Sequence, residues 1–438
     1  MPDSATEFRK EDVKTGIYCS QLKKQITDKT DTLQTKKREY LLRLLSAATF
    51  IIFFQLYMVA PLIPGLSSYF KVTEQTVGLI VPAFLIPYGI FTLFYGLLAD
   101  KIGTKLIILI SLFLFATFTA LTAFSQSVPQ LIFWRLLTGI GASGVIPISL
   151  AWIGQTYTYK ERGRPLGFVF GAVAGGSAFG ASAGVFLESF IGWKLLFIGV
   201  AVVALLIWTI LYLTYKKMSA PQVTKQGLTL SKVFIGYKQL LTSLRGRSAY
   251  SFVFLNGIFV SGVYTWLALY LERNYSLNGW QIGLALLGYG IPGFVFGPFI
   301  GRLADKFGRS KLLPFGLFLG ALSSSILIFN IPLTLARVSI IALSLGFDLS
   351  QPLLAGIITQ VGKEKSGQAM SVMAFMLFVG FGLGSYLFGL ALKLGFTDAL
   401  IIFSTFQIVM AVIAIPLFKS ETYAKSLKSE PSVLKNKV

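Results

Sequence analysis

The sequence contains no histidine, and Cys19 is its single cysteine. A disulfide within the chain is therefore impossible, and the usual Cys/His metal sites cannot be assembled, so we expect no metal. Any proton transfer must use carboxylates, tyrosine, lysine or water instead of imidazole. Cys19 lies in a polar tail, where an incidental thiol is a better interpretation than a lipidated one.

Charge is also scarce. Only 13% of the 438 residues are charged, against about 25% in soluble domains, while 54% are hydrophobic and the mean hydropathy is +0.72. The formal net charge of +21 would suggest nucleic acid for a soluble protein. However, most Lys and Arg residues lie in the tails and in alternate loops, as expected of a membrane protein that fixes its orientation. We therefore predict an integral membrane protein with lipid around it and no nucleic-acid partner.

Motifs for nucleotide use and for catalysis are missing. The sequence has no phosphate-binding loop of the form GxxxxGK[ST], so we do not expect ATP to drive the protein. No catalytic constellation of side chains is evident either. The sequence therefore predicts neither an enzyme nor a bound cofactor.

Twelve apolar runs follow a polar N-terminal stretch. A helix needs about 20 apolar residues to cross the hydrocarbon core of a membrane. Because backbone groups in lipid must pair within their own segment, these runs are predicted to be helices. The predicted spans are 43–64, 75–98, 105–124, 129–154, 166–187 and 194–215, then 249–271, 279–301, 311–330, 334–359, 367–391 and 398–418.

Polar stretches divide the predicted all-α membrane protein into five parts. A tail over 1–42 precedes a six-helix bundle over 43–215, and a central loop over 216–247 precedes a second six-helix bundle over 248–418. A second polar tail covers 419–438. Within the central loop, the amphipathic pattern from Val233 to Leu244 predicts a short surface helix.

The distribution of basic residues predicts the orientation. Of the 39 Lys and Arg residues, 33 lie on one side of the predicted membrane protein and five on the other, and Arg135 lies inside a predicted helix. Those five are Lys71, Lys194, Arg273, Arg337 and Lys393. Cytoplasmic loops carry the excess of basic residues, so both tails and the central loop are expected in the cytoplasm.

One stretch occurs twice. GLLADKIGTKL follows the second predicted span, and GRLADKFGRSK follows the eighth, 205 residues later. Gly78 and Gly283, like Pro87 and Pro292, extend the same register backwards. One helix–loop–helix unit is therefore repeated, and internal repetition constrains the architecture of the whole chain. The paired motif residues are Gly96, Asp100, Lys101 and Gly103 in the first copy and Gly301, Asp305, Lys306 and Gly308 in the second.

Two six-helix halves with this repeated loop resemble the major facilitator superfamily, whose loop signature is G-x-L-A-D-[RK]-x-G-[RK]-[RK]. Thr104 and Ser310 each replace one basic residue of that signature. Gly96 and Gly301 are expected to let a neighbouring helix approach closely, and Asp100 and Asp305 to pair near helix ends. The resemblance implies two pseudo-symmetric bundles and a loop that latches one state of the transport cycle. The alternative is a plain topological anchor.

Two charged residues lie deep inside predicted spans, away from their ends. Arg135 must find a partner or a watery cavity, and with Gly139 it resembles the superfamily's fourth-helix motif, which is linked to proton coupling or substrate handling. The alternative is a structural arginine paired with backbone. Asp348 lies near the middle of its span, where a carboxylate suits proton binding. Its alternative is a hydrogen-bonded side chain held by Ser350, Gln351 or a neighbouring helix.

The fifth predicted span is rich in glycine. Its pattern resembles the superfamily's antiporter signature, although Ala181 and Val185 stand where the signature has Pro and Gly. We expect these glycines to pack on a partner helix across the two halves, which favours export; generic packing of small residues is the alternative. The glycines are Gly167, Gly176, Gly180 and Gly184.

Polar and aromatic residues in the first, seventh and tenth spans are candidates for a substrate cavity between the halves. Such a cavity suits amphipathic organic molecules. The candidates are Gln55, Tyr57, Asn256, Tyr264, Trp266 and Gln351.

These observations predict a secondary active transporter. The favoured function is proton-coupled antiport that exports a small organic molecule or drug by alternating access, with that molecule and protons as its ligands. The alternatives are proton-linked uptake of a metabolite and a transporter-like receptor that does not cycle. The resemblance further implies a monomer in a bacterial inner membrane.

Overall fold

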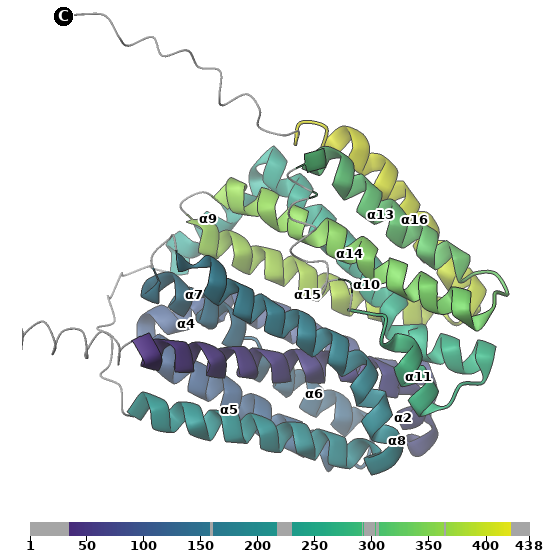
Figure 1. Cartoon of the computed structure of the whole chain (residues 1–438), viewed down its shortest axis with the longest axis horizontal. Coiled ribbons are helices and arrows are strands. Elements are labelled where there is room, and N and C mark those ends of the chain that lie inside the picture. The colour runs from purple at the N-terminus through teal and green to yellow at the C-terminus, as the bar shows by residue number, and fades with distance from the viewer. Residues whose placement is uncertain are drawn as a thin grey trace, which may run out of the picture.

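The computed structural model describes residues 35–157, 161–216, 230–290, 292, 303, 306–362 and 365–421. All regular elements in these ranges are helices. Figure 1 shows two groups of roughly parallel helices, one from the first half of the chain and one from the second, lying side by side. This agrees with the predicted fold class of two six-helix bundles.

The first bundle contains the helical stretch Thr35–Phe70, which ends in η1 and α2, followed by helices up to α8. The bounds are η1 Ala60–Leu62, α2 Ile63–Phe70, α3 Glu74–Gly78, α4 Ile80–Ile102, α5 Thr104–Ala123, α6 Val128–Ala142, α7 Val145–Thr156 and α8 Gly163–Lys216. The remaining elements are α9 Leu230–Thr242, α10 Leu244–Tyr275, α11 Gly279–Leu286, α13 Arg309–Ile326, α14 Leu333–Gly362, α15 Ser366–Ala391 and α16 Phe396–Leu417.

Helix lengths agree with the predicted spans. In the described ranges, 9 helices are long and apolar enough to cross a membrane. One of them, α8, holds the fifth and sixth predicted spans, which meet at Gly192 with a φ of 75°. The ninth predicted span is α13. The eighth is described only at its start, in α11, and most of its remainder lies outside the described residues.

The fourth predicted span is confirmed as one stretch, Val128–Thr156, but a short turn divides it into two helices. Helix α6 ends at Ala142 and α7 begins at Val145. A side chain on Gly144 would collide with Tyr95 and with the hydroxyl of Ser111, so the chain passes close to α4 and α5 where the helix is interrupted. Close packing with two neighbours accompanies this break, and the apolar pattern of the sequence gave no sign of it.

The repeat is visible in the backbone. Gly103 and Gly308, at the equivalent position of the two loops, have φ values of 102° and 80°. Both conformations suit glycine, which has no Cβ to clash. Gly141 and Gly346, also 205 residues apart, each press against the preceding helix, α5 in the first bundle and α13 in the second. The two halves thus share both their turns and their helix contacts.

The helix-five glycines pack within their own bundle, which corrects the expectation of a contact across the halves. A side chain on Gly176 or Gly180 would collide with the carbonyl oxygen of Phe50 or Phe54, both in the stretch Thr35–Phe70. The second bundle has the same contact between α15 and α10, where Gly380 and Gly384 face the carbonyls of Phe254 and Ile258. The pattern therefore serves helix packing in both halves.

The predicted surface helix of the central loop is α9, which ends two residues earlier than expected because Ser243 caps the next helix, α10. Its Tyr237 hydroxyl donates to the carbonyl of Leu93 in α4 at 3.2 Å. On the other side, Lys365 donates to Gln239 at 3.0 Å. Burial raises the pKa of Tyr237 to about 12, so its hydroxyl remains a donor at neutral pH. Helix α9 thus touches both bundles.

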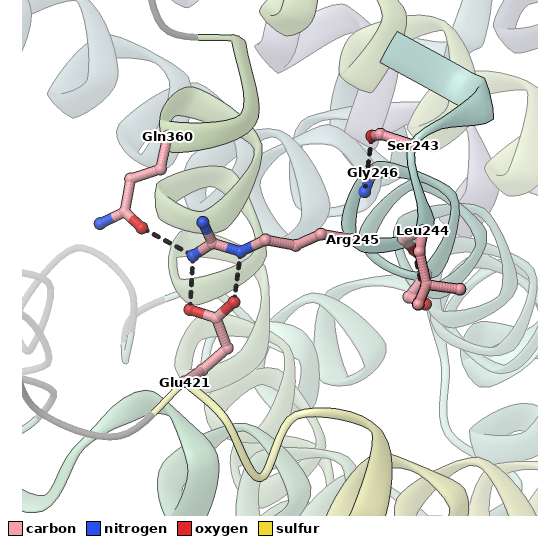
Figure 2. Close-up of polar contacts among 7 residues, drawn as sticks. Ser243, Leu244, Arg245, Gly246, Gln360 and Glu421 are labelled. Carbon is pink, nitrogen blue, oxygen red and sulfur yellow. Dashed lines mark hydrogen bonds and ion pairs between the residues drawn. The ribbon is translucent and has the colours of Figure 1, made fainter. Parts of the chain in front are cut away.

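Figure 2 shows how one end of the second bundle is held together. The guanidinium of Arg245, at the start of α10, binds both carboxylate oxygens of Glu421 beyond α16, at 2.5 and 2.7 Å. The same group donates to Gln360 of α14 at 2.7 Å. The carbonyl of Glu421 also accepts from the backbone amide of Ser310 in α13. This bidentate ion pair and the two hydrogen bonds beside it thus join α10, α13, α14 and the end of α16.

Glycine packing in α8 predicts a stability difference between two alanine substitutions. We expect Gly180→Ala to lower stability by about 1–3 kcal/mol through overpacking against Phe54. Gly171→Ala is the matched control, because its new Cβ meets no atom within 4 Å and alanine favours a helix. Thermal unfolding of the detergent-solubilised protein, followed by size-exclusion chromatography, measures both. Equal melting temperatures would contradict the packing described here.

Candidate functional site

Three tyrosines meet at the interface of the two bundles. The ring centroids of Tyr57 and Tyr264 lie 5.4 Å apart, and those of Tyr264 and Tyr289 lie 4.2 Å apart. The Tyr264 hydroxyl donates to the backbone carbonyl of Tyr57 at 3.1 Å. Since Tyr57 belongs to the first bundle and the other two to the second, this tyrosine cluster joins the halves.

Asp348 lies beside the tyrosine cluster, near the midpoint of α14. It is half-buried, and its carboxylate accepts a hydrogen bond from Ser344 at 3.3 Å. The same carboxylate interacts electrostatically with Tyr57 and Tyr289. A carboxylate at this depth is energetically expensive, and such groups in membrane proteins commonly mark a pathway or a proton site.

The backbone is interrupted next to this carboxylate. Helix α11 ends at Leu286, and Gly290 has a φ of 86°. The amide of Gly290 donates to the hydroxyl of Ser344 at 3.0 Å, and this hydroxyl in turn donates to Asp348. Backbone polar groups released by a broken helix at membrane depth are tolerated where protein satisfies them, and such breaks mark many transporter sites.

A small cavity lies against the tyrosine cluster. Its volume is about 20 Å³, which is too small for an organic substrate. The buried hydroxyl of Thr265 faces it without a hydrogen-bond partner in the described part of the chain. The remaining lining includes Leu56, Val81, Val260 and Phe381. In this conformation the two bundles are therefore closed onto each other around the tyrosines.

Further contacts join the two bundles at the end of the molecule opposite the repeated loops. Trp266 fits between Gly78 of α3 and Gly389 of α15, and its indole donates to the carbonyl of Ser385 at 3.1 Å. An exposed ion pair joins Arg273 to Glu74 at 3.0 Å. The structure therefore places Trp266, a candidate cavity residue, in a seal between helices of both halves.

Two other cavity candidates are buried among the helices of a single bundle. Gln55 donates to Thr119 at 3.2 Å inside the first bundle. Asn256 donates to Ser350 at 3.1 Å and accepts from Gln407 at 2.9 Å inside the second. These two side chains hold helices of one bundle together.

Gln351 is different, because both ends of its amide lack a hydrogen-bond partner among the described residues, whereas in Gln55 only the oxygen does. The side chain is 8% exposed, and neither its amide nitrogen nor its oxygen has a partner in the described ranges. It follows Asp348 by three residues on α14, so both project from adjacent turns of the same helix face. An unsatisfied buried amide beside Asp348 is suited to a water or a bound ligand.

Arg135 is buried in the first bundle, at 1% exposure. Its guanidinium lies 4.3 Å from the ring centre of Phe84 and its Nε donates to the carbonyl of Ile80 at 3.4 Å, both in α4. No carboxylate among the described residues pairs with it, and its Nη1 has no partner there. A side chain on Gly139 would collide with the Phe84 backbone. This packing matches the alternative in which Arg135 is a structural arginine paired with backbone. A role of Arg135 in proton coupling stays a prediction.

The repeated loops are described in part. Gly301, Asp305 and the side chain of Asp100 lie outside the described residues. Lys101 is exposed, and the Lys306 ammonium lies 5.4 Å from the ring centre of Phe307. Among the described residues, a side chain on Gly96 would meet no atom within 4 Å, so they show no close helix approach there. Gly167 of α8 is equally open.

Sequence reasoning missed Ser344 and Gly290, which complete the surroundings of Asp348. A signal for Gly290 existed, because Gly288, Gly290 and Pro292 interrupt an apolar run with helix-breaking residues. Ser344 precedes Asp348 by four residues, the spacing of neighbours on one helix face. That spacing alone does not distinguish it from other serines in the span.

The family model described as the Major Facilitator Superfamily matches residues 45–280 and 249–437 of the chain. The chain belongs to this superfamily. Its transporter fold and its membrane location are therefore confirmed.

Curated relatives are distant and cover most of the chain. Multidrug resistance protein 1 of Bacillus subtilis strain 168 is 23% identical over 350 residues, which are 79% of this chain and 88% of the relative. Riboflavin transporter RibZ of Clostridioides difficile strain 630 is 24% identical over 380 residues, 74% of this chain and 82% of the relative.

Solved structures support the fold. A bacterial homologue of the human lysosomal transporter Spinster, in an inward-facing and occupied conformation, superposes with a TM-score of 0.71 at 16% identity, covering 89% of this chain and 99% of that one. The D-xylose-proton symporter superposes with a TM-score of 0.69 at 16% identity, covering 85% and 96%.

The hydrogen bond between the tyrosines predicts a shift in conformational balance. Tyr264→Phe keeps the ring contacts but removes the bond to Tyr57, so the closed arrangement should lose about 1 kcal/mol, or roughly fivefold in population. Spin labels at Ser68 and Asn274, after Cys19 is replaced by serine, report the distance between the halves at this end.

The matched control for this experiment is Tyr275→Phe. Its hydroxyl also donates to a carbonyl, that of Ile331, but within one bundle. It should leave the distance distribution unchanged. If Tyr264→Phe and Tyr275→Phe behave alike, the tyrosine cluster does not hold the halves together.

Proposed function

We propose that this superfamily transporter is a proton-coupled antiporter that exports a small organic molecule or drug by alternating access, with Asp348 as the proton-binding group. The membrane proposed is a bacterial inner membrane, with both chain ends in the cytoplasm and the protein as a monomer. The loop motifs around Gly103 and Gly308 are proposed as the latch of the cycle. The observation that carries the proposal is the carboxylate of Asp348 beside a broken helix.

The surroundings of Asp348 support proton binding. The carboxylate is half-buried near the midpoint of a membrane helix and receives a hydroxyl bond from Ser344. Burial of a carboxylate disfavours its charged form unless a partner compensates, so exchange of a proton is a natural response to a change of conformation. Tyr57 of the first bundle and Tyr289 of the second interact electrostatically with it, so movement of one bundle changes its environment.

The direction of transport is supported by the relatives. Two of them are named multidrug resistance proteins, each 23–24% identical to this chain. The glycines of helix five add little, because α15 repeats the same packing with Gly380 and Gly384. An aromatic interface lined by Tyr57, Tyr264 and Tyr289 suits amphipathic organic molecules.

Proton-linked uptake of a metabolite is the second candidate. The named riboflavin transporter is 24% identical to this chain, about as similar as the multidrug proteins are, and the D-xylose-proton symporter shares the fold at 16% identity. The same carboxylate and alternating bundles serve both directions. The direction of proton movement relative to substrate therefore distinguishes the two functions.

Asp348→Asn tests the assigned proton site. The full chain is reconstituted into vesicles with a pH gradient, and a panel of amphipathic compounds is added while internal pH and compound are recorded. The native protein should move protons and compound in opposite directions. Asp348→Asn should reduce both coupled fluxes to the level of empty vesicles, because an amide does not titrate.

Glu272→Gln is the matched control, since this carboxylate is exposed at the end of α10 away from the repeated loops. It should transport like the native chain. Normal coupled flux in Asp348→Asn would remove Asp348 as the coupling group. Protons and compound moving in the same direction would establish uptake by symport. Compound binding without any flux would identify a receptor.

A further inference from the structure

A groove opens between the stretch Thr35–Phe70 and the first turns of α8, at the end that carries the repeated loops. Its volume is about 580 Å³. Ala47 and Phe50 form one wall, and Gly167, Phe168 and Gly171 form the other. Its lining residues include neither Asp348 nor any member of the tyrosine cluster.

Glycine spacing gives the groove its wedge shape. At Gly176 and Gly180 the two helices touch, so no side chain fits between them. A Cβ on Gly175, the neighbour of Gly176, would lie 3.5 Å from Phe50. One turn or more towards the loops, on Gly171 or Gly167, a Cβ would meet nothing within 4 Å. The helices therefore diverge towards the loop end and leave an apolar slot.

Basic side chains stand at the open end of this slot. Arg164 lines the groove and binds both oxygens of Glu39, at 2.9 and 3.2 Å. Arg43 is exposed one helical turn beyond Glu39, on the same face as Ala47 and Phe50. Lys36 is exposed two turns before Arg43 on that face. In the described ranges Arg43 and Lys36 have no ion-pair partner, so the mouth of the groove has excess positive charge.

Ser46 also lines the groove and is 8% exposed. Its hydroxyl oxygen is covered by protein and has no hydrogen-bond partner in the described part of the chain, so Ser46 forms part of the wall and its hydroxyl is not open to an occupant.

We propose that this groove binds one anionic phospholipid. The headgroup phosphate contacts Arg43 and Arg164, and an acyl chain fills the slot along Gly167 and Gly171. Basic pockets between membrane helices on the cytoplasmic side are recognised sites for anionic headgroups. Arginine suits a phosphate because its planar fork donates two parallel hydrogen bonds.

The test uses the full chain in detergent with phosphatidylglycerol or phosphatidylcholine of identical tails, and counts retained lipid by native mass spectrometry. The native chain should retain phosphatidylglycerol in preference. Arg43→Gln and Arg164→Gln should each weaken that retention about fivefold, the effect of one basic residue at a membrane surface. Arg247→Gln is the charge control, because it is exposed in α10 at the loop end of the other bundle; it should have no effect.

Two further variants separate the slot from the charge. Gly171→Leu fills the groove without changing charge and should abolish retention of both lipids. Glu39→Gln frees Arg164 and should strengthen retention of phosphatidylglycerol. Monodisperse elution on size-exclusion chromatography checks folding, and Arg43→Gln at an exposed site keeps the test decisive where Arg164→Gln does not fold.

The proposal is overturned if the native chain retains both lipids equally, if Arg247→Gln acts like Arg43→Gln, or if Gly171→Leu retains phosphatidylglycerol like the native chain. Each outcome is independent of the coupled-flux assay on Asp348, so failure of one proposal leaves the other standing.

Discussion

In a hydrocarbon environment every backbone amide and carbonyl must find its partner inside the protein, and most of this structure depends on that requirement. It makes the spans helices and leaves three ways to shape the interior: where a helix ends, where it breaks, and how closely two helices approach. Glycine serves all three. Gly103 and Gly308 turn the backbone at the repeated loops. Gly180 and Gly384 let helices touch. Gly290 adopts a positive φ where the helix has ended near Asp348.

The coarse architecture was predictable because membrane thickness sets the length of an apolar run and the repeated loop fixes the symmetry. Which side chains point into a cavity between the bundles was harder to predict, for a physical reason. A membrane helix is apolar on nearly all sides, so its periodicity does not tell a cavity from a bundle interior. Gln55 and Asn256 illustrate this, since both polar side chains satisfy neighbours within one bundle. The interruption at Gly144 was equally invisible, because it accompanies packing against two other helices.

The glycines of the fifth predicted span have a counterpart in the second bundle. In isolation the pattern indicated a contact across the halves and a direction of transport. The equivalent contact of α15 on α10 shows that the same spacing holds helices together in a bundle where no such signature was expected. A feature present in both halves belongs to the scaffold. Specific chemistry must come from what the halves do not share.

Asp348 is such a difference. Gly141 and Gly346 make equivalent contacts 205 residues apart, and Pro147 and Pro352 keep the same register. Between them, Ser143 of the first half occupies the position of Asp348. The Ser143 hydroxyl is satisfied by a carbonyl of its own helix, that of Ile140, at 2.9 Å. An ionised carboxylate accepts hydrogen bonds and does not donate them, so Asp348 accepts one from the hydroxyl of Ser344. That hydroxyl in turn accepts a hydrogen bond from the backbone amide of Gly290, beyond the end of α11. Duplication supplies two similar bundles, and under the proposed function a carboxylate at this position of only one bundle would make the pair respond unequally to a proton.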